Sequence, residues 1–299
     1  MSDANTERGK SLWQEAWAKL RKQKLAMICL WIIGFYAVVA IYGEATYRYY
    51  QIKDKTAPYQ NQELANQYQP PSAKHIFGTD NLGRDVGARL IQGTRVAFHV
   101  GIITSLIAIP IGVLLGCLAG YFGGKIDDFI VWLYSTFASI PSLLFILAIA
   151  MAVGKGLTGI FLGIGLTAWV PLCRLIRAEV MKHRERAYVM AARALGFSDA
   201  RIIFRHILPN VFHIVIVNFT LRFPAAIGTE VIMSFLGIGV QGEPSWGVMI
   251  NNARTRLWQG VWWEMTFATL AIFILVLAFN LLGDALRDAL DPRLRDGER

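Results

Sequence analysis

Long apolar blocks alternate with shorter polar stretches along the chain. An α-helix needs about 20 apolar residues to cross the hydrocarbon core of a bilayer, and the blocks come close to or exceed that length. The pattern predicts an all-α integral membrane protein with six transmembrane helices. The predicted spans are residues 25–43, 96–121, 129–153, about 157–173, 211–239 and 265–282.

The polar stretches divide the rest of the chain into segments outside the membrane. Residues 1–24 are basic and carry Trp13 and Trp17 one helical turn apart, as in an amphipathic helix at the membrane surface. Because this segment is long for the start of a signal peptide, we interpret 25–43 as an uncleaved anchor. The predicted domains are the N-terminus 1–24, the first span 25–43, an extracytoplasmic segment 44–95, a five-helix core 96–284 that contains a loop at 174–209, and a tail 285–299.

The distribution of charge predicts the orientation. The chain has a formal net charge of +9, and its Lys and Arg residues concentrate in the N-terminus and in the loop 174–209. Basic loops of membrane proteins lie on the cytoplasmic side, and an even number of spans then places both termini in the cytoplasm. The same rule explains the positive charge without a nucleic-acid partner.

The sequence offers little that could carry enzyme chemistry. Its histidines lack the paired spacing of a metal or haem site, and its cysteines form no CxxC pair and suit small buried positions. Residues 4–11 fit a loose phosphate-loop pattern, but no apolar strand precedes them. We therefore expect no catalytic residue, no metal and no cofactor in this chain. The residues considered are His75, His99, His183, His206, His213, Cys29, Cys117 and Cys173.

Three glycines recur at intervals of four in the second predicted span. Gly112, Gly116 and Gly120 line one helix face, where missing side chains let another backbone approach closely. We interpret this face as a helix-packing surface, with a substrate path along it as the alternative.

The loop 174–209 is predicted to form a helix–turn–helix hairpin. Ala and Arg favour a helix up to Leu195, and Gly196 can adopt the left-handed conformation that ends it. Ser198 can cap a second short helix, which Pro209 separates from the next span.

The hairpin resembles a known family. Ala191 and Ala192 are small enough to let a partner protein press close. Together with Gly196 and the pair Leu208–Pro209 they resemble the "EAA" loop of binding-protein-dependent ABC transporter permeases. Further motifs resemble the C-type permease subunit of the oligopeptide/dipeptide branch, and the resemblance covers nearly the whole chain. These motifs are GTDNLGRD at 78–85, SFLGIG at 234–239, PSWG at 244–247 and GDALRDALDP at 283–292.

The resemblance implies a type I importer core and a set of partners. In this family the loop docks on a cytoplasmic ATPase. The partners would be a second permease subunit, two ATPases that bind ATP and Mg²⁺, an extracytoplasmic binding protein and the lipid of a bacterial inner membrane. Met190 stands where the family usually has Glu, and His206 where Ile is common, so we expect docking to rely on packing and on Arg193. The implied coupling residues are Tyr188, Ala191, Ala192, Arg193, Leu195, Gly196, Leu208 and Pro209.

Two charged residues fall within the fifth predicted span. Arg222 and Glu230 flank Pro224, which can break the helix beside a pathway. Charges inside a membrane are costly and usually pair or face a cavity. We expect Glu230 to border the translocation pathway with Arg222 or the sister subunit as partner; a structural pair or an interfacial position is the alternative.

The function predicted from these observations is inward transport of di- or oligopeptides, driven by partner ATPases. Nickel, glutathione and antimicrobial peptides are alternative cargoes, because related permeases carry each of them. A self-sufficient secondary transporter would need ion-coupling charges in its spans, and only Arg222 and Glu230 are available. A membrane anchor of an enzyme complex would need cofactor ligands, and the sequence shows no such pattern.

Overall fold

The computed structural model describes residues 12–240 and 242–290, and every extended regular element in these ranges is a helix. Short helices η1 (Leu64–Asn66) and η3 (Arg254–Gln259) and a π-helical turn η2 (Ile202–Ile207) accompany the α-helices. The α-helices are α1 (Leu12–Lys22), α2 (Lys24–Ile52), α3 (Val86–Phe122), α4 (Gly124–Ser139), α5 (Ser142–Val153), α6 (Leu157–Thr167), α7 (Val170–Arg184), α8 (Ala187–Ala194), α9 (Asp199–Arg201), α10 (Leu208–Phe235), α11 (Trp246–Ala253) and α12 (Trp263–Leu290).

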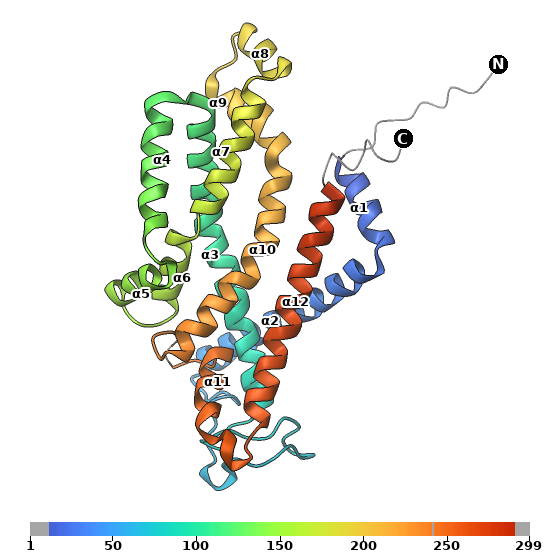
Figure 1. Cartoon of the computed structure of the whole chain (residues 1–299). Helices are drawn as coiled ribbons and strands as arrows, with labels where there is room; N and C mark the ends of the chain where they lie inside the picture. Colours follow the sequence, from blue (N-terminus) through green and yellow to red (C-terminus); the bar gives the residue numbers. More distant parts are fainter. Residues whose placement is uncertain (1–11, 241, 291–299) are drawn as a thin grey trace, which may run out of the picture.

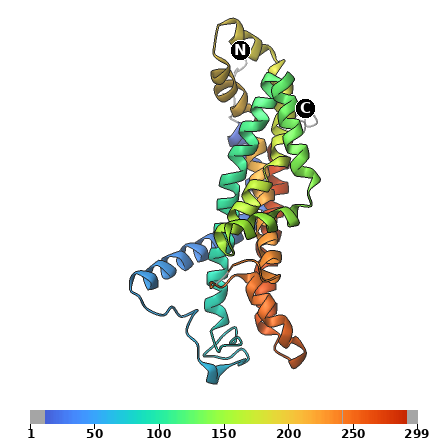
Figure 2. The same ribbon diagram turned by 90° about the vertical axis from the view of Figure 1, so that its left-hand side faces the viewer.

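The helices form an elongated bundle around α3 (Figure 1). With 37 residues, α3 is about 55 Å long. It joins two ends of the molecule: the hairpin end, where α8 and α9 lie, and the cap end, where α11 lies beside residues 53–85, which we call the cap. In the turned view α2 leaves the bundle at an angle (Figure 2).

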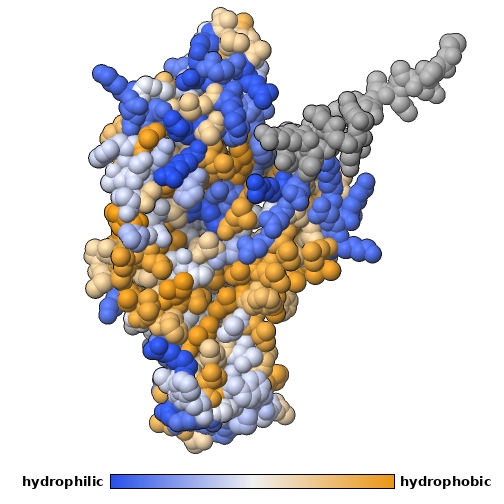
Figure 3. All heavy atoms as spheres, viewed as in Figure 1, coloured by the Kyte–Doolittle hydropathy of each residue, from blue (hydrophilic) through white to orange (hydrophobic). Residues whose placement is uncertain are grey.

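The hydropathy of the helices agrees with a membrane-spanning protein. Five helical stretches are long and apolar enough to cross a bilayer, and a sixth span results if the bent pair α4 and α5 counts as one. Figure 3 shows hydrophobic residues concentrated in the middle of the molecule, between more hydrophilic ends. The all-α membrane fold predicted from the sequence is therefore confirmed.

The outline of three predicted spans needs correction. The third, 129–153, is not one rod, because α4 and α5 meet at Pro141 with a bend of 91°. The fourth continues through α7 to Arg184, so half of the predicted loop 174–209 is helix. The fifth begins early, because α9, η2 and α10 read as one helical stretch over Asp199–Phe235.

The glycine stripe of α3 is a packing surface, as the first interpretation held. A Cβ atom added to Gly112, Gly116 or Gly120 would come within 2.9, 2.8 and 2.7 Å of backbone carbonyl oxygens of α7. Side chains at these positions would force the two helices apart. The predicted burial of Cys29, Cys117 and Cys173 is also confirmed.

The ends of the chain join the bundle through α1, α2 and α12. Leu20 of α1 and Cys29 of α2 pack with Ala278 and Leu282 of α12 in one apolar cluster. The predicted phosphate-loop pattern at 4–11 and the end of the tail at 291–299 lie outside the described residues.

Candidate functional site

The hairpin, residues 187–207, is shaped by one glycine. Helix α8 ends at Ala194, and Gly196 follows with φ +77°. The Gly196 N–H donates to the Arg193 carbonyl at 3.0 Å, and the Phe197 N–H donates to the Ala192 carbonyl at 3.2 Å. This is the Schellman pattern, which satisfies the last carbonyls of the helix and turns the chain back.

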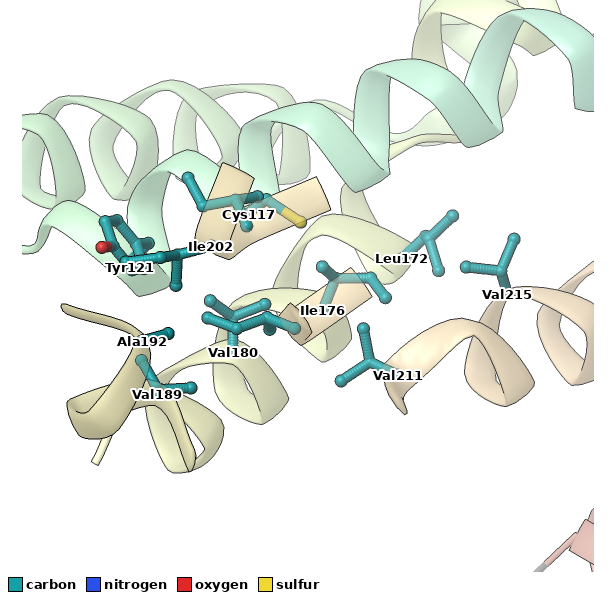
Figure 4. Packing of buried hydrophobic residues seen from close by; sticks show 12 residues of the cluster. Cys117, Tyr121, Leu172, Ile176, Val180, Val189, Ala192, Ile202, Val211 and Val215 are labelled. Atoms are coloured by element: carbon teal, nitrogen blue, oxygen red, sulfur yellow. The ribbon is translucent and has the colours of Figure 1, made fainter. Parts of the chain in front are cut away.

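One side of the hairpin is anchored in the apolar core of its own chain. Val189 and Ala192 of α8 pack with Ile202 of η2 against Ile176 and Val180 of α7 (Figure 4). Such burial stabilises the hairpin by the removal of apolar surface from water. The hairpin is thus fastened to α7 and to the end of α3.

The expectation that Ala191 and Ala192 both face a partner is therefore wrong for Ala192. Ala192 is 4% exposed within the chain itself, whereas Ala191 is exposed. Neighbours in a helix point about 100° apart, so one turn cannot present both to the same surface. The small size of Ala192 instead suits the close packing of α8 on the core.

The outer side of the hairpin presents large apolar side chains. Met190, Leu195 and Phe204 are 54%, 73% and 54% exposed. Exposed apolar residues ringed by charge are typical of protein–protein contact sites. Arg193, also exposed, lies in this ring. The sequence analysis included Leu195 and Arg193 in the site and noted Met190, but missed Phe204, whose exposure depends on how η2 packs.

Polar contacts tie the hairpin to α3 and α7. Tyr121 of α3 donates from its hydroxyl to Asp199 Oδ1 at 2.6 Å, and the Arg193 guanidinium lies 5.5 Å from the Tyr121 ring centre. His183 Nδ1 and the Tyr188 hydroxyl are 2.8 Å apart. Burial raises the pKa of the Tyr188 phenol, so this group stays protonated at neutral pH.

Leu208 and Pro209 do not separate the hairpin from the span. The helix passes through them, with Leu208 packed against the core and Pro209 exposed. Proline lacks an N–H and its ring crowds the carbonyl four residues earlier, and a π-helical turn is one way to accommodate both. The turn η2 lies directly before Leu208, where such an adjustment is needed. Within it, His206 stacks on Phe197 at a centroid distance of 5.6 Å.

Arg222 and Glu230 are not paired with each other. They lie eight residues apart in α10, a rise of about 12 Å. An Arg222 Nη1–H donates to the Ala168 carbonyl oxygen instead. Pro224 between them does not break α10, because Phe223 and Ile227 on either side are packed in the core.

Glu230 holds the segment that follows α10. It is 1% exposed and accepts a hydrogen bond from Ser234 Oγ at 2.6 Å. Ser234 Oγ in turn accepts from the Val240 N–H at 3.1 Å. Glu230 thus fixes the loop 236–245 through Ser234; its predicted place beside a pathway stays a prediction.

Arg95 forms a second buried ionic connection at the cap end. Its guanidinium donates to Glu44 of α2 at 2.8 Å and to Glu243 of the loop 236–245 at 2.9 Å, and it lies 3.6 Å from the Tyr47 ring centre. The sequence analysis missed this group. Its members are far apart in the chain, and the only early signal is a charge at the edge of an apolar block.

Residues 112–296 match the family described as binding-protein-dependent transport system inner membrane component. Residues 11–71 match the N-terminal transmembrane domain of oligopeptide transport permease C. The chain belongs to the binding-protein-dependent permease family. The resemblance inferred from the loop motif is thereby confirmed, and the permease is an inner-membrane protein.

Several curated relatives are similar over nearly the whole permease. Dipeptide transport system permease protein DppC of Bacillus subtilis is 40% identical, over 95% of this chain and 87% of the relative. Oligopeptide transport system permease protein OppC of the same species is 36% identical, over 95% and 91%. Glutathione transport system permease protein GsiD of Pectobacterium atrosepticum is 34% identical, over 95% and 92%.

A solved structure supports the fold of the permease. A chain of the MetNI methionine ABC transporter in an inward-facing conformation matches with a TM-score of 0.52 at 20% identity. The match covers 68% of this permease and 96% of that chain. The predicted type I importer core is therefore confirmed as a fold.

Proposed function

We propose that this permease is one of two membrane subunits of an ATP-driven importer of short peptides. The relatives named for dipeptide and oligopeptide transport support the cargo. A second permease subunit would complete the pore, and an extracytoplasmic binding protein would deliver the peptide. Two ATPase subunits would bind and hydrolyse ATP, and this chain would supply no cofactor.

The observation that carries this proposal is the two-sided hairpin. Its outer side exposes Met190, Leu195 and Phe204, and its inner side is packed into the core through Val189 and Ala192. A partner that binds the outer side can move the inner side only together with α7 and the end of α3. Docking there gives an ATPase a mechanical connection to the spans, which a loose basic loop would not.

This role assigns an orientation to the permease. The hairpin and both termini would lie in the cytoplasm, and the cap would lie outside. The arginines and lysines of α7 and the hairpin fit the cytoplasmic side. The cap end would then receive peptide from the binding protein.

Glutathione is a second candidate cargo, because relatives named for its transport are 34% identical over 95% of the chain. A secondary transporter is less well supported. The two candidate coupling charges of α10 are already engaged, Arg222 with a carbonyl and Glu230 with Ser234.

Reconstituted uptake tests the proposed function. The permease, its sister subunit, the two ATPases and the binding protein are inserted in liposomes with ATP and labelled dialanine, trialanine or glutathione. We expect uptake of the alanine peptides that requires ATP hydrolysis and saturates. Uptake of glutathione alone would select the second cargo, and uptake driven by an ion gradient without ATPases would contradict the proposal.

A further inference from the structure

A polar pocket of about 320 Å³ opens at the cap end of the permease. Its walls come from segments far apart in the chain: Tyr59 and Gln60 of the cap, Arg89 of α3, the loop 236–245, and Asn252 of α11. The volume falls at the lower end of the range for small-molecule sites. It suits a ligand the size of a dipeptide rather than an element of a folded protein.

One side of the pocket carries two guanidinium groups. Arg84 is hydrogen-bonded through Nε to Asp80 Oδ2 at 2.7 Å, and Asp80 also accepts the backbone N–H of Leu82 and of Arg84 at 2.9 Å each. Arg89 is 3% exposed, and its Nε lies 3.3 Å from Asp80 Oδ2 without forming a hydrogen bond. Asp80 is thus largely saturated by Arg84 and by the backbone.

Arg89 is left with less compensation than a buried charge needs. The buried carboxylate of Glu264 interacts with it, but forms no ion pair with it in the described part of the chain. An uncompensated buried guanidinium is costly, whereas a bidentate carboxylate would satisfy it. This side of the pocket therefore favours a carboxylate.

Another side of the pocket carries a fixed carboxylate. Glu243 accepts a hydrogen bond from the Tyr47 hydroxyl through Oε1 at 3.1 Å and from Arg95 through Oε2 at 2.9 Å. A carboxylate has about four acceptor sites, so Glu243 can still accept from a ligand ammonium group.

We propose that this pocket binds a short zwitterionic peptide, with its carboxylate at Arg84 and Arg89 and its ammonium group toward Glu243. The side-chain amides of Gln60 and Asn252 supply donors and acceptors for the peptide bond. The inference rests on the proposed function and adds an outward-facing subsite within the permease itself. A peptide released by the binding protein would be held there before it enters the membrane pathway.

Direct binding to the purified transporter tests the pocket. The complex of both permease subunits and the ATPases, without binding protein, is dialysed against labelled dialanine, its C-terminal amide and its N-acetyl form. We expect saturable binding of dialanine and weaker binding of both modified forms, by about threefold or more, because each loses one ionic contact. Equal binding of all three forms would overturn the proposal.

Charge changes at an exposed rim residue separate binding from folding. Gln60 is exposed and lines the pocket, so Gln60→Glu should weaken dialanine binding about threefold and Gln60→Lys should strengthen it. Gln62 is exposed two residues away and does not line the pocket, so Gln62→Glu is the matched control and should change nothing. Arg84→Gln should weaken binding about tenfold.

Two further outcomes would overturn the subsite. The pocket would then hold a side chain of the binding protein if Gln60→Glu weakened docking of the ligand-free binding protein but left dialanine binding unchanged. If dialanine were taken up by the complete transporter but did not bind without the binding protein, the proposed function would stand and the subsite would fall. Failure of uptake with intact dialanine binding would have the opposite meaning.

Discussion

The Tyr121 hydroxyl donates a hydrogen bond to Asp199 Oδ1 at 2.6 Å, which joins the last turn of α3 to the second arm of the hairpin. The two residues lie 78 positions apart in the chain. Because α3 continues from this contact to Arg95 and the pocket at the cap end, the bond links the candidate docking site to the far end of the permease.

Loss of this bond should uncouple ATP hydrolysis from uptake. Tyr121→Phe keeps the ring in the core and removes one hydrogen bond to a carboxylate, a loss of about 1 kcal/mol. We expect ATPase co-purification to stay at the wild-type level while peptide uptake per ATP falls severalfold. Asp199→Ala should have the same effect, and the double variant should be no worse than either. Additive losses would show that the two residues act separately.

The two sides of the hairpin should respond differently to an added charge. Leu195→Glu alters the outer side, and we expect ATPase co-purification to fall about tenfold with no change in the thermal stability of the permease. Ala192→Asp buries an unpaired charge, costs several kcal/mol, and should lower that stability as well.

A control for Leu195→Glu is available at the opposite end of the molecule. Leu257 is also an exposed apolar residue, and Leu257→Glu should leave ATPase co-purification unchanged. Full retention of the ATPases by Leu195→Glu would exclude the outer side as the docking surface.

Gly196 should be required for its backbone conformation rather than for space. A Cβ atom there meets nothing within 4 Å, but φ is +77°. Gly196→Ala should therefore cost about 1 kcal/mol, and Gly196→Val more, because a β-branched residue is strained at positive φ. Gly196→Asn, which tolerates this conformation, is the control and should retain uptake. Thermal unfolding and uptake of the three variants test the order.

Glu230 should tolerate loss of its charge but not loss of its oxygen. In Glu230→Gln an amide oxygen can still accept from Ser234 Oγ, so we expect near-normal uptake and stability. Glu230→Ala should lose about 2 kcal/mol and release the loop 236–245. A strong fall in uptake of assembled Glu230→Gln would instead support the pathway role predicted from sequence.

Impermeant thiol labelling tests the orientation. In intact cells a Cys at Gln60 of the cap should be modified and a Cys at Ser198 of the hairpin should be spared. The three native cysteines are buried, so background labelling should be low. Ser198 should be labelled only after the cells are opened; the reverse pattern would invert the topology.

The sequence by itself determined the helices, the family and the position of the hairpin. Apolar blocks of membrane-spanning length permit little else, and Gly196 ends a helix wherever a chain needs positive φ. The stripe of Gly112, Gly116 and Gly120 likewise announced a close helix contact, because bare backbone on one face has few other uses.

Only the tertiary structure decided which side of each element faces inward. Ala191 and Ala192 are identical in type, and their different burial follows from how α8 rests on α7. Arg222 and Glu230 suggested a pair by charge alone, yet each found a nearer partner through the packing of α10. The joining of Glu44, Arg95 and Glu243 depends on three segments that meet only after folding. Local patterns specify a helix, whereas the partners of a buried charge are set by contacts between residues distant in the chain.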